Sequence, residues 1–323
     1  MNVEFVEEID DNVKLRVHGN KPTCNTSMFE INPAIGCQFQ CQYCNAYTQE
    51  KENCFSGVKV YRNYPQYLDN YIRENIQDSK GRFFYFSPKI EAFQPCLVES
   101  GISYEILSVL KKYNLRCIIV TKSGRLPEKL ETLMIEMKDL LQILISCSMP
   151  NEKVREIIEP GAASIKERYE LAKFCMVNGI KTTSIFSPIF PVEDYAYIKK
   201  YIDDFYSMGI THFRLNFAEI TRDSYDKLVA LLPFYEEDFK KVYLADEALE
   251  THWKIPYTDK ETLRYFPSVE YMKKVFNEVK EYGETKADDI TFSVCNSLCV
   301  QGKLEHFNDK AHSRGFGCIG YRW

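Results

Sequence analysis

The stretch that decides the fold is GCQFQCQYCNAY, residues 36–47. Its three cysteines, Cys37, Cys41 and Cys44, have the spacing C-x3-C-x2-C, and Tyr43 stands directly before the third. Thiolates at such a spacing are typical ligands of a soft metal centre. Structural zinc sites and ferredoxin-type [4Fe–4S] clusters both use four protein ligands. Three cysteines on a four-iron cluster leave one iron open, and the sequence therefore predicts that another molecule fills the fourth position.

Two alternatives stay open from the residues alone. One is a zinc knuckle completed by Cys24, Cys54 or a distant histidine, and the other is a set of buried free cysteines. The chain has 12 cysteines in 323 residues, a net charge of −5 and no secretory signal or long apolar run at its start. We therefore expect a cytoplasmic protein whose thiols stay reduced, since disulfides are rare in that compartment.

Hydrophobic periodicity and helix breakers predict strands that alternate with helices from about residue 27 to residue 216. Such alternation indicates an α/β fold with a parallel sheet. The predicted strands are Ser27–Ile35, Arg82–Ser87, Leu115–Thr121, Gln142–Ser148, Lys181–Ser187 and His212–Asn216. The predicted helices are Pro65–Gln77, Ser103–Tyr113, Leu126–Lys138, Ser164–Asn178 and Val192–Met208.

The cysteine motif resembles the radical S-adenosylmethionine (SAM) superfamily. The resemblance implies a partial (β/α)6 barrel, similar to a TIM barrel, in which Cys37, Cys41 and Cys44 hold a [4Fe–4S] cluster. It also implies that SAM binds the open iron and is cleaved to a 5′-deoxyadenosyl radical, which removes a hydrogen atom from the substrate. We expect residues 1–216 to form the barrel with its N-terminal lead-in, and residues 217–323 to form a substrate-side extension that closes the active site.

Later motifs resemble the branch that includes the spore photoproduct lyases. FSPKIEAFQP, residues 86–95, is similar to the branch signature T-D-x-Y-Q-P, with Glu91 in place of Asp and Phe93 in place of Tyr. IIEPGAASIKERYELA, residues 157–172, is similar to E-P-x-A-x-S-x-x-x-R, and SPIFP, residues 187–191, is similar to P-I-I-P. The matches cover residues 30–195, about half of the chain.

Active residues of such barrels gather where the strands end. Carbonyl groups near Ser87 or the carboxylate of Glu91 suit the ammonium group of SAM, and a cation suits its carboxylate. Ser146 and Ser148 share one face of a strand, so either reaches the ribose or the carboxylate, while Cys147 faces the other side. The predicted SAM-binding residues are Tyr43, Ser87, Glu91, Lys122, Ser146, Ser148 and Arg168.

Several of these roles have rivals. Glu91 is alternatively a solvated glutamate, and Arg168 is alternatively a structural partner of Glu159. Tyr43 is expected to offer its backbone to the adenine edge while its ring packs. Cys147 is a candidate hydrogen-atom donor, the role that a cysteine plays in spore photoproduct lyase. Three further cysteines near the end of the sequence have three possible roles, and these are Cys295, Cys299 and Cys318. They are reduced thiols in a segment folded over the active site, or one of them is the hydrogen-atom donor, or they hold an auxiliary cluster.

The resemblance implies a lyase, and the net charge of the chain limits the classes of substrate that it can bind. Proteins that grip duplex DNA usually carry a basic face, and this chain is acidic. We therefore expect a small modified nucleobase, as in queuine lyase, which converts queuine to 7-aminomethyl-7-deazaguanine in queuosine salvage. The alternatives are a DNA photoproduct lyase, a peptide-modifying enzyme with an auxiliary cluster, and a non-enzymatic iron–sulfur or zinc module. The enzyme needs an electron donor such as flavodoxin or ferredoxin, and we expect neither a membrane nor a nucleic acid as its partner.

Overall fold

The structure is a computed structural model that describes residues 1–18, 28–44, 56–191, 195–245, 248–254, 261–295, 304, 306–317 and 320–321. The chain forms two compact units. Unit 1 comprises residues 1–39, 52–145 and 166–182, and unit 2 comprises residues 40–51, 146–165 and 183–323. The boundary predicted at residues 216 and 217 divides the chain differently and stays a prediction.

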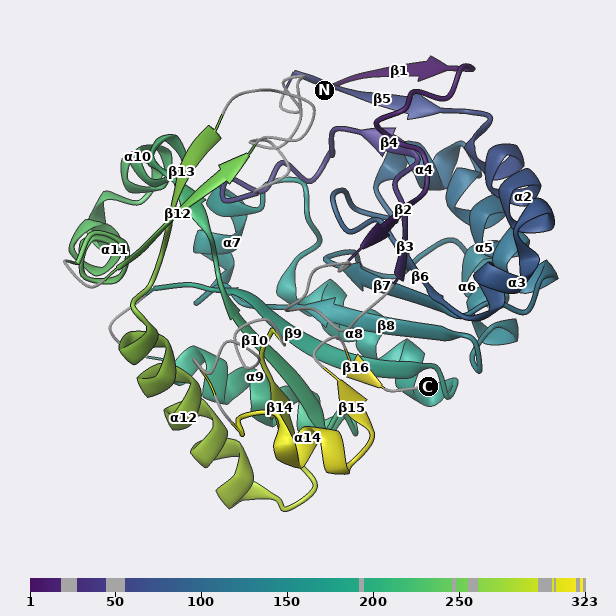
Figure 1. The fold of residues 1–323 in the computed structure, drawn as a ribbon. Coiled ribbons are helices and arrows are strands. Elements are labelled where there is room, and N and C mark those ends of the chain that lie inside the picture. Colours follow the sequence, from purple (N-terminus) through teal and green to yellow (C-terminus); the bar gives the residue numbers. More distant parts are fainter. Residues whose placement is uncertain are drawn as a thin grey trace. The chain divides into compact units, whose positions relative to one another are not determined.

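The main sheet of the fold has eight strands in the order β14-β10-β9-β8-β7-β6-β3-β2 (Figure 1). In unit 1, β3, β6, β7 and β8 run parallel in register, and β2 pairs with β3 antiparallel. The strands of this part are β2 (Arg16–His18), β3 (Met28–Ile31), β6 (Phe83–Phe86), β7 (Cys117–Thr121) and β8 (Leu141–Ser146). The α/β fold with a parallel sheet, expected for a partial TIM-like barrel, is therefore confirmed.

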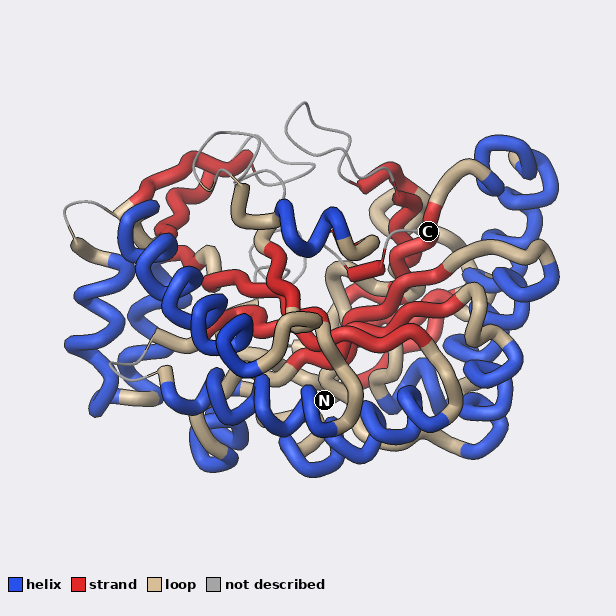
Figure 2. Tube along the Cα trace, turned by 90° about the horizontal axis from the view of Figure 1, so that it is seen from below, coloured by secondary structure: helices blue, strands red, loops and turns tan. Residues whose placement is uncertain are grey.

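Helices cover one face of the unit 1 strands (Figure 2). Phe29 of β3 shows how they pack, since its ring lies 5.3 Å from that of Phe84 and 5.7 Å from that of Tyr71 on α2. The helices are α2 (Tyr64–Glu74), α3 (Ile76–Lys80), α4 (Pro95–Glu99), α5 (Ile102–Lys112), α6 (Glu128–Glu136) and α8 (Ile165–Val177).

A second, three-stranded sheet near the N-terminus was not predicted. Its strands are β1 (Asn2–Val6), β5 (Gly57–Tyr61) and β4 (Ala34–Ile35), in the order β1-β5-β4. The predicted strand Ser27–Ile35 is thus divided into β3 and β4, and its first residue lies outside the described residues. Pro33 lies between the two strands, and proline lacks the N–H donor that a continuous ladder needs.

Unit 2 contains the parallel strands β9 (Lys181–Ile189), β10 (His212–Phe217) and β14 (Thr291–Ser293). A small antiparallel sheet consists of β11 (Ile220–Thr221), β13 (Glu261–Phe266) and β12 (Leu249–Lys254), and a hairpin of β15 (Phe316–Gly317) and β16 (Gly320–Tyr321). Its helices are α7 (Glu152–Ile158), α9 (Ala196–Ser207), α10 (Arg222–Leu231), η1 (Pro233–Tyr235), α11 (Glu236–Tyr243), α12 (Val269–Lys286) and α14 (Asp309–Ser313). None of the helices in the described residues has the length and apolar character needed to cross a membrane.

His212 is buried at the start of β10 with both ring nitrogens occupied. Nδ1 lies 2.9 Å from the hydroxyl oxygen of Thr291, and Nε2 lies 3.0 Å from that of Ser293. The ring of Phe316 stacks on the imidazole with the centroids 4.3 Å apart. Burial and then the nearby charge of Arg214 lower the pKa of His212 to about 3. The folded protein therefore keeps this ring neutral.

We predict that His212 makes the protein less stable in acid. The unfolded chain binds a proton near pH 6.5, well before the folded chain does, so the free energy of unfolding falls as the pH drops from about 6.5 towards 3. At pH 5 the loss from this group is about 2 kcal/mol relative to pH 7. Urea unfolding at both pH values measures it.

His212→Gln should remove most of this difference, whereas His306→Gln is the matched control because His306 is exposed. Equal pH dependence in the native protein and in His212→Gln would contradict the assignment.

Candidate functional site

The beginning of the cysteine loop is anchored in unit 1 by two glutamine side chains. Gln94 accepts a hydrogen bond from the backbone N–H of Gln38 at 2.9 Å and donates one to the carbonyl of Gly36 at 3.4 Å. Gln38 in turn accepts from the backbone N–H of Cys96 at 2.7 Å. These bonds surround Cys37 on both sides along the chain. They explain the glutamine of the FQP segment, to which the sequence analysis gave no role.

Gly36 needs to be glycine. Its φ of +89° lies in the region that L side chains avoid, and a Cβ there would collide with the carbonyl oxygen of Gly57 on β5. The chain therefore turns sharply between β4 and the first cysteine.

The second half of the loop is anchored in unit 2, beside the end of α7. The backbone N–H of Gln42 donates to the carbonyl of Ile158 at 2.8 Å, and the hydroxyl of Tyr43 donates to the carboxylate of Glu159. A turn bond joins the N–H of Cys44 to the carbonyl of Cys41 at 3.0 Å. The ring of Tyr43 thus has a structural contact, and the role of its backbone in binding SAM stays a prediction.

Arg155 holds the segment that carries Glu159. Its guanidinium is buried and donates to the carboxylate of Glu152 at 2.5 Å and to the carbonyls of Glu159 and Ala162 at 3.1 and 3.0 Å. Sequence analysis missed this residue, although an arginine four residues before an E-P segment was a visible signal.

The described cysteines fall into two chemical classes. Cys37, Cys41 and Cys44 are partly exposed, as is Cys295, whereas Cys96, Cys117, Cys147 and Cys175 are buried. Burial raises the pKa of the Cys96 and Cys175 thiols to about 12, and it raises that of Cys117 further. Because the thiolate is the ligand form, the loop cysteines suit iron and those three buried thiols do not.

The cluster ligands are assigned from the spacing of the three cysteines. No group of three or more Cys, His, Asp or Glu side chains in the described residues is already arranged to hold a metal ion. Cys24, Cys54, Cys299 and Cys318 lie outside the described residues, so neither the zinc alternative nor an auxiliary cluster is tested.

In unit 1, Glu91 braces the ends of two neighbouring strands. Its carboxylate accepts from the hydroxyl of Thr121 at 2.7 Å and from the backbone N–H groups of Lys122 and Phe93 at 3.0 and 3.1 Å. Desolvation raises the pKa of Glu91, although these three donors oppose the shift. A carboxylate has about four acceptor positions, so one remains for the ammonium group of SAM. That role stays a prediction, and the positioning of Lys122 is what the contacts show.

Two predicted hydroxyls have no hydrogen-bond partner in the part of the chain that the structure describes. Ser87 at the end of β6 is 3% exposed, and Ser148 after β8 is 1% exposed. A buried hydroxyl without a partner is costly, so each such group calls for an explanation. The ribose and carboxylate oxygens of SAM are suitable partners, and the residues present therefore fit that molecule.

The remaining predicted residues are placed as follows. Ser146 ends β8 and donates to the carbonyl of Ser187 at 3.3 Å. Cys147 is completely buried, and Arg168 is buried on α8 in unit 1. Hydrogen donation by Cys147 and carboxylate binding by Arg168 stay predictions.

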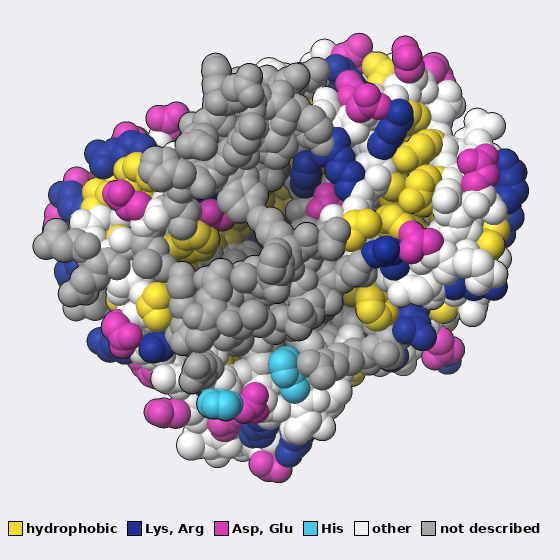
Figure 3. Space-filling view, in the orientation of Figure 1, with side chains coloured by type: hydrophobic (Ala, Val, Ile, Leu, Met, Phe, Trp, Pro, Cys, Tyr) yellow, Lys and Arg dark blue, Asp and Glu magenta, His cyan; other side chains and the backbone are white. Residues whose placement is uncertain are grey.

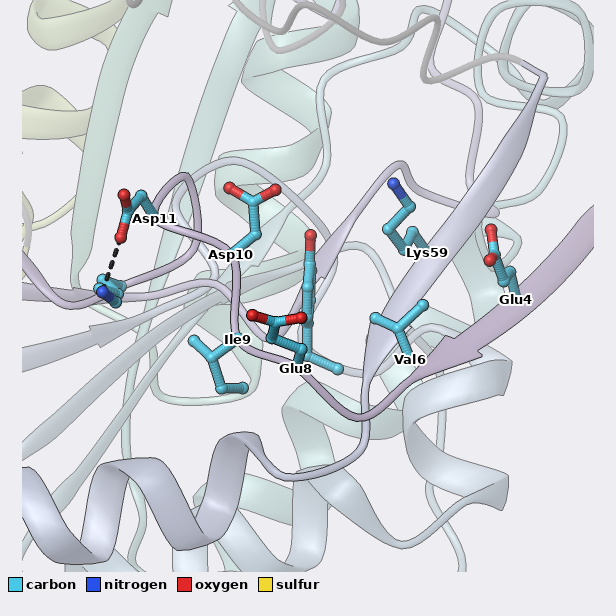
Figure 4. Close-up of a pocket in the computed structure, with 9 residues that line it drawn as sticks. Glu4, Val6, Glu8, Ile9, Asp10, Asp11 and Lys59 are labelled. Carbon is cyan, nitrogen blue, oxygen red and sulfur yellow. Dashed lines mark ion pairs between the residues drawn. The ribbon is translucent and has the colours of Figure 1, made fainter.

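Unit 1 contains a cavity of about 650 Å³, and none of the predicted site residues lines it (Figure 4). Asp11 forms an ion pair with Lys14 there, with 2.6 Å between the charged atoms. The lining has more acidic than basic side chains and comprises Glu4, Val6, Glu8, Ile9, Asp10, Asp11, Lys14, Lys59 and Tyr61. We assign no role in SAM binding to this cavity.

The family model of the radical SAM superfamily matches residues 31–205, more than half of the chain. The protein belongs to the radical SAM superfamily. It is therefore an enzyme that uses a [4Fe–4S] cluster and SAM. These expectations from the sequence are confirmed at the level of the family.

Two curated relatives are similar over about half of the chain. The uncharacterised protein ORF301 of Acidianus two-tailed virus is 28% identical over 170 residues, which cover 50% of this chain and 56% of that protein. The uncharacterised protein MJ0683 of Methanocaldococcus jannaschii is 26% identical over 185 residues, which cover 55% of this chain and 68% of that protein. The match to the viral protein thus spans little more than half of its length.

Solved structures extend the likeness in fold. Spore photoproduct lyase complexed with dinucleoside spore photoproduct has a TM-score of 0.62 at 15% identity, covering 90% of this chain and 81% of that chain. SuiB of Streptococcus suis bound to S-adenosylmethionine has a TM-score of 0.56 at 14% identity, covering 88% and 56%. At these identities the likeness shows the fold.

We predict that Cys37, Cys41 and Cys44 are all required for the cluster. Replacing any one of them with alanine should abolish the thiolate-to-iron absorbance and all cleavage of SAM, because each supplies one iron ligand. Cys175→Ala on α8 is the control, since this buried thiol has no predicted role at the cluster. Iron and sulfide counts on anaerobically reconstituted protein measure the outcome, and SAM cleavage by Cys41→Ala would refute the assignment.

We also predict that Gln94 is needed to shape the loop. Gln94→Leu removes one acceptor and one donor and leaves the N–H of Gln38 unpaired, at a cost of about 1–3 kcal/mol in the free energy of unfolding. Cluster loading should fall while the far-ultraviolet circular dichroism stays native. Gln66→Leu on the exposed side of α2 is the control, and equal cluster loading in both variants would remove Gln94 from the site.

Proposed function

We propose that the protein is a radical SAM lyase that acts on a small modified nucleobase, with queuine as the leading candidate. The observation that carries the small-molecule part is the charge, since the chain has a net charge of −5. Acidic and basic side chains are mixed over the face in Figure 3. Enzymes that hold duplex DNA need several phosphate contacts from lysine and arginine, which a mixed surface supplies poorly.

The chain's own residues have defined tasks in this proposal. When bound, the cluster and SAM supply one-electron cleavage of SAM and removal of a hydrogen atom from the substrate. Gln94 and Glu159 fix the loop that carries the ligand cysteines, and Ser87 and Ser148 orient SAM through their hydroxyls. Cys147 is the proposed hydrogen-atom donor. A ferredoxin or flavodoxin supplies the electron, and we propose the cytoplasm as the location.

The aromatic residues of unit 2 limit how the base is held. A buried cluster of side chains includes Phe190 and Phe239, with ring centroids 5.4 Å apart, and Tyr235 lies 5.4 Å from Phe190. Such rings pack against one another and stabilise unit 2. The aromatic wealth of the sequence therefore serves the core first, and polar contacts have to contribute to recognition of the base.

A DNA photoproduct lyase is the second candidate. The observation that favours it is the similarity in fold to spore photoproduct lyase over 81% of that chain. A peptide-modifying enzyme is a third, and it depends on Cys299 and Cys318, which lie outside the described residues.

Salt dependence separates the first two candidates. We predict that queuine binds with almost no dependence on salt, because a free base has no phosphate and releases no counterions. Binding of duplex DNA would weaken with salt at a slope near −0.9 for each phosphate contact. Reconstituted protein is titrated anaerobically with queuine and with a thymine-rich duplex at two salt concentrations.

Formation of 5′-deoxyadenosine and of the deazaguanine product on adding queuine supports the proposal. A titration with adenine in the absence of SAM is the control for non-specific stacking of a base on the protein. Steep salt-dependent binding of DNA together with no turnover of queuine would favour photoproduct repair instead.

A further inference from the structure

One face of β10 turns away from the helices of unit 2. Phe217 lies on the other face, where its ring centroid is 5.7 Å from that of Phe276 on α12. Phe213 shares that face, because successive side chains of a strand point to opposite sides. Three polar side chains alternate with these rings and share the face away from α12, namely His212, Arg214 and Asn216.

The strand neighbours of Arg214 provide it with no acceptor. In register, Arg214 lies between Ile185 of β9, which is apolar, and Ser293 of β14. The hydroxyl of Ser293 is already bonded to His212. The hydroxyl groups of Thr291 and Ser293 therefore bond to the imidazole of His212 and not to the guanidinium of Arg214.

Arg214 is partly exposed, and it lacks the carboxylate partner that the buried arginines of unit 2 have. Its Nε is buried without a hydrogen-bond partner, and no carboxylate among the described residues forms an ion pair with it. Arg264 has a buried Nε of the same kind, but its guanidinium lies 3.1 Å from the carboxylate of Glu219. Arg155 donates to a carboxylate and to two carbonyls. A buried N–H group without an acceptor is unfavourable, and no carboxylate stabilises the charge of this guanidinium, so the arginine calls for an explanation outside the fold.

Asn216 stands two residues further along the same face, towards the strand end. Its amide nitrogen donates to the hydroxyl of Ser187 at 3.4 Å, a long bond that orients the side chain only loosely. The face thus presents a guanidinium donor and an amide two residues apart.

We propose that Arg214, together with Asn216, binds an oxygen acceptor of the substrate. A guanidinium offers parallel N–H groups that match a carboxylate, a phosphate or the carbonyl edge of a base. The inference deepens the proposed function and rests on it for the substrate: in a deazaguanine base the acceptor is the ring carbonyl. Arg214 is the third residue of the six-residue β10, whereas Ser87 and Ser148, whose hydroxyls are proposed to orient SAM, follow the ends of β6 and β8. The acceptor is therefore assigned to the substrate and not to the carboxylate of SAM.

The first experiment tests the unpaired cation without any ligand. Arg214→Met and Arg264→Met are compared by thermal unfolding of the metal-free protein. Arg214→Met should leave the melting temperature unchanged or raise it, because it removes a charge that has no carboxylate partner and a buried N–H that has no acceptor. Arg264→Met should lower it, since Glu219 is left without its partner. If both variants lose stability equally, Arg214 is a structural residue and the proposal is wrong.

The second experiment identifies the acceptor. Reconstituted native protein, Arg214→Gln and Arg214→Lys are titrated with queuine, guanine, a dinucleoside monophosphate, inorganic phosphate and SAM. We expect Arg214→Gln to weaken binding at least tenfold for each compound, other than SAM, that the native protein binds, with partial recovery in Arg214→Lys. A response to queuine and guanine indicates the carbonyl edge, and a response to the phosphate compounds indicates an anion.

The outcomes separate the two proposals. Loss of phosphate binding in a protein that ignores queuine would refute the nucleobase function and support the role of Arg214. Weakened binding of SAM alone, native affinity in Arg214→Gln, or no binding of any compound other than SAM would each overturn that role.

Discussion

A single buried amide determines where the cysteine loop begins. Gln94 is completely buried and satisfies its oxygen and its nitrogen with backbone groups on both sides of Cys37. A buried amide of this kind has no water to replace a lost partner, so its bonds fix the local path of the chain. Gly36 supplies the sharp turn that the path requires. Cys37, the first predicted iron ligand, is thus placed by the loop after β6, which is far from it in the sequence.

The parallel sheet was predictable because its signals are local. Buried strands such as Cys117–Thr121 and Leu141–Ser146 are short apolar runs, and the helices between them have clear starts and stops. The small N-terminal sheet was not predictable, since β1 pairs with β5 about fifty residues away and local sequence patterns carry no information on such a pairing. The same holds for β12 and β13, whose polar sequences resemble loops.

The residues of the candidate site also differ in how far local sequence patterns predict them. The spacing alone predicts the three cysteines as cluster ligands, because thiolates at short intervals are a chemical signature of metal sites. The supports of the site have none: Gln94, Gln38 and Arg155 act through backbone groups, and only the folded chain shows which carbonyl or N–H lies within reach. Glu91 illustrates the difference, since its residue type suggested a contact to the cofactor, whereas the structure shows it bonded to Thr121, Lys122 and Phe93.

The contrast among the cysteines has a practical meaning for handling the protein. Cys96, Cys117 and Cys175 stay protonated and enclosed at neutral pH, so alkylating reagents and oxygen act first on the partly exposed thiols. Mass spectrometry after brief alkylation therefore distinguishes an intact fold from a damaged one, because labelled Cys117 means that the sheet has opened. Labelling of Cys117 therefore reports on the integrity of the fold independently of the absorbance of an iron–sulfur cluster.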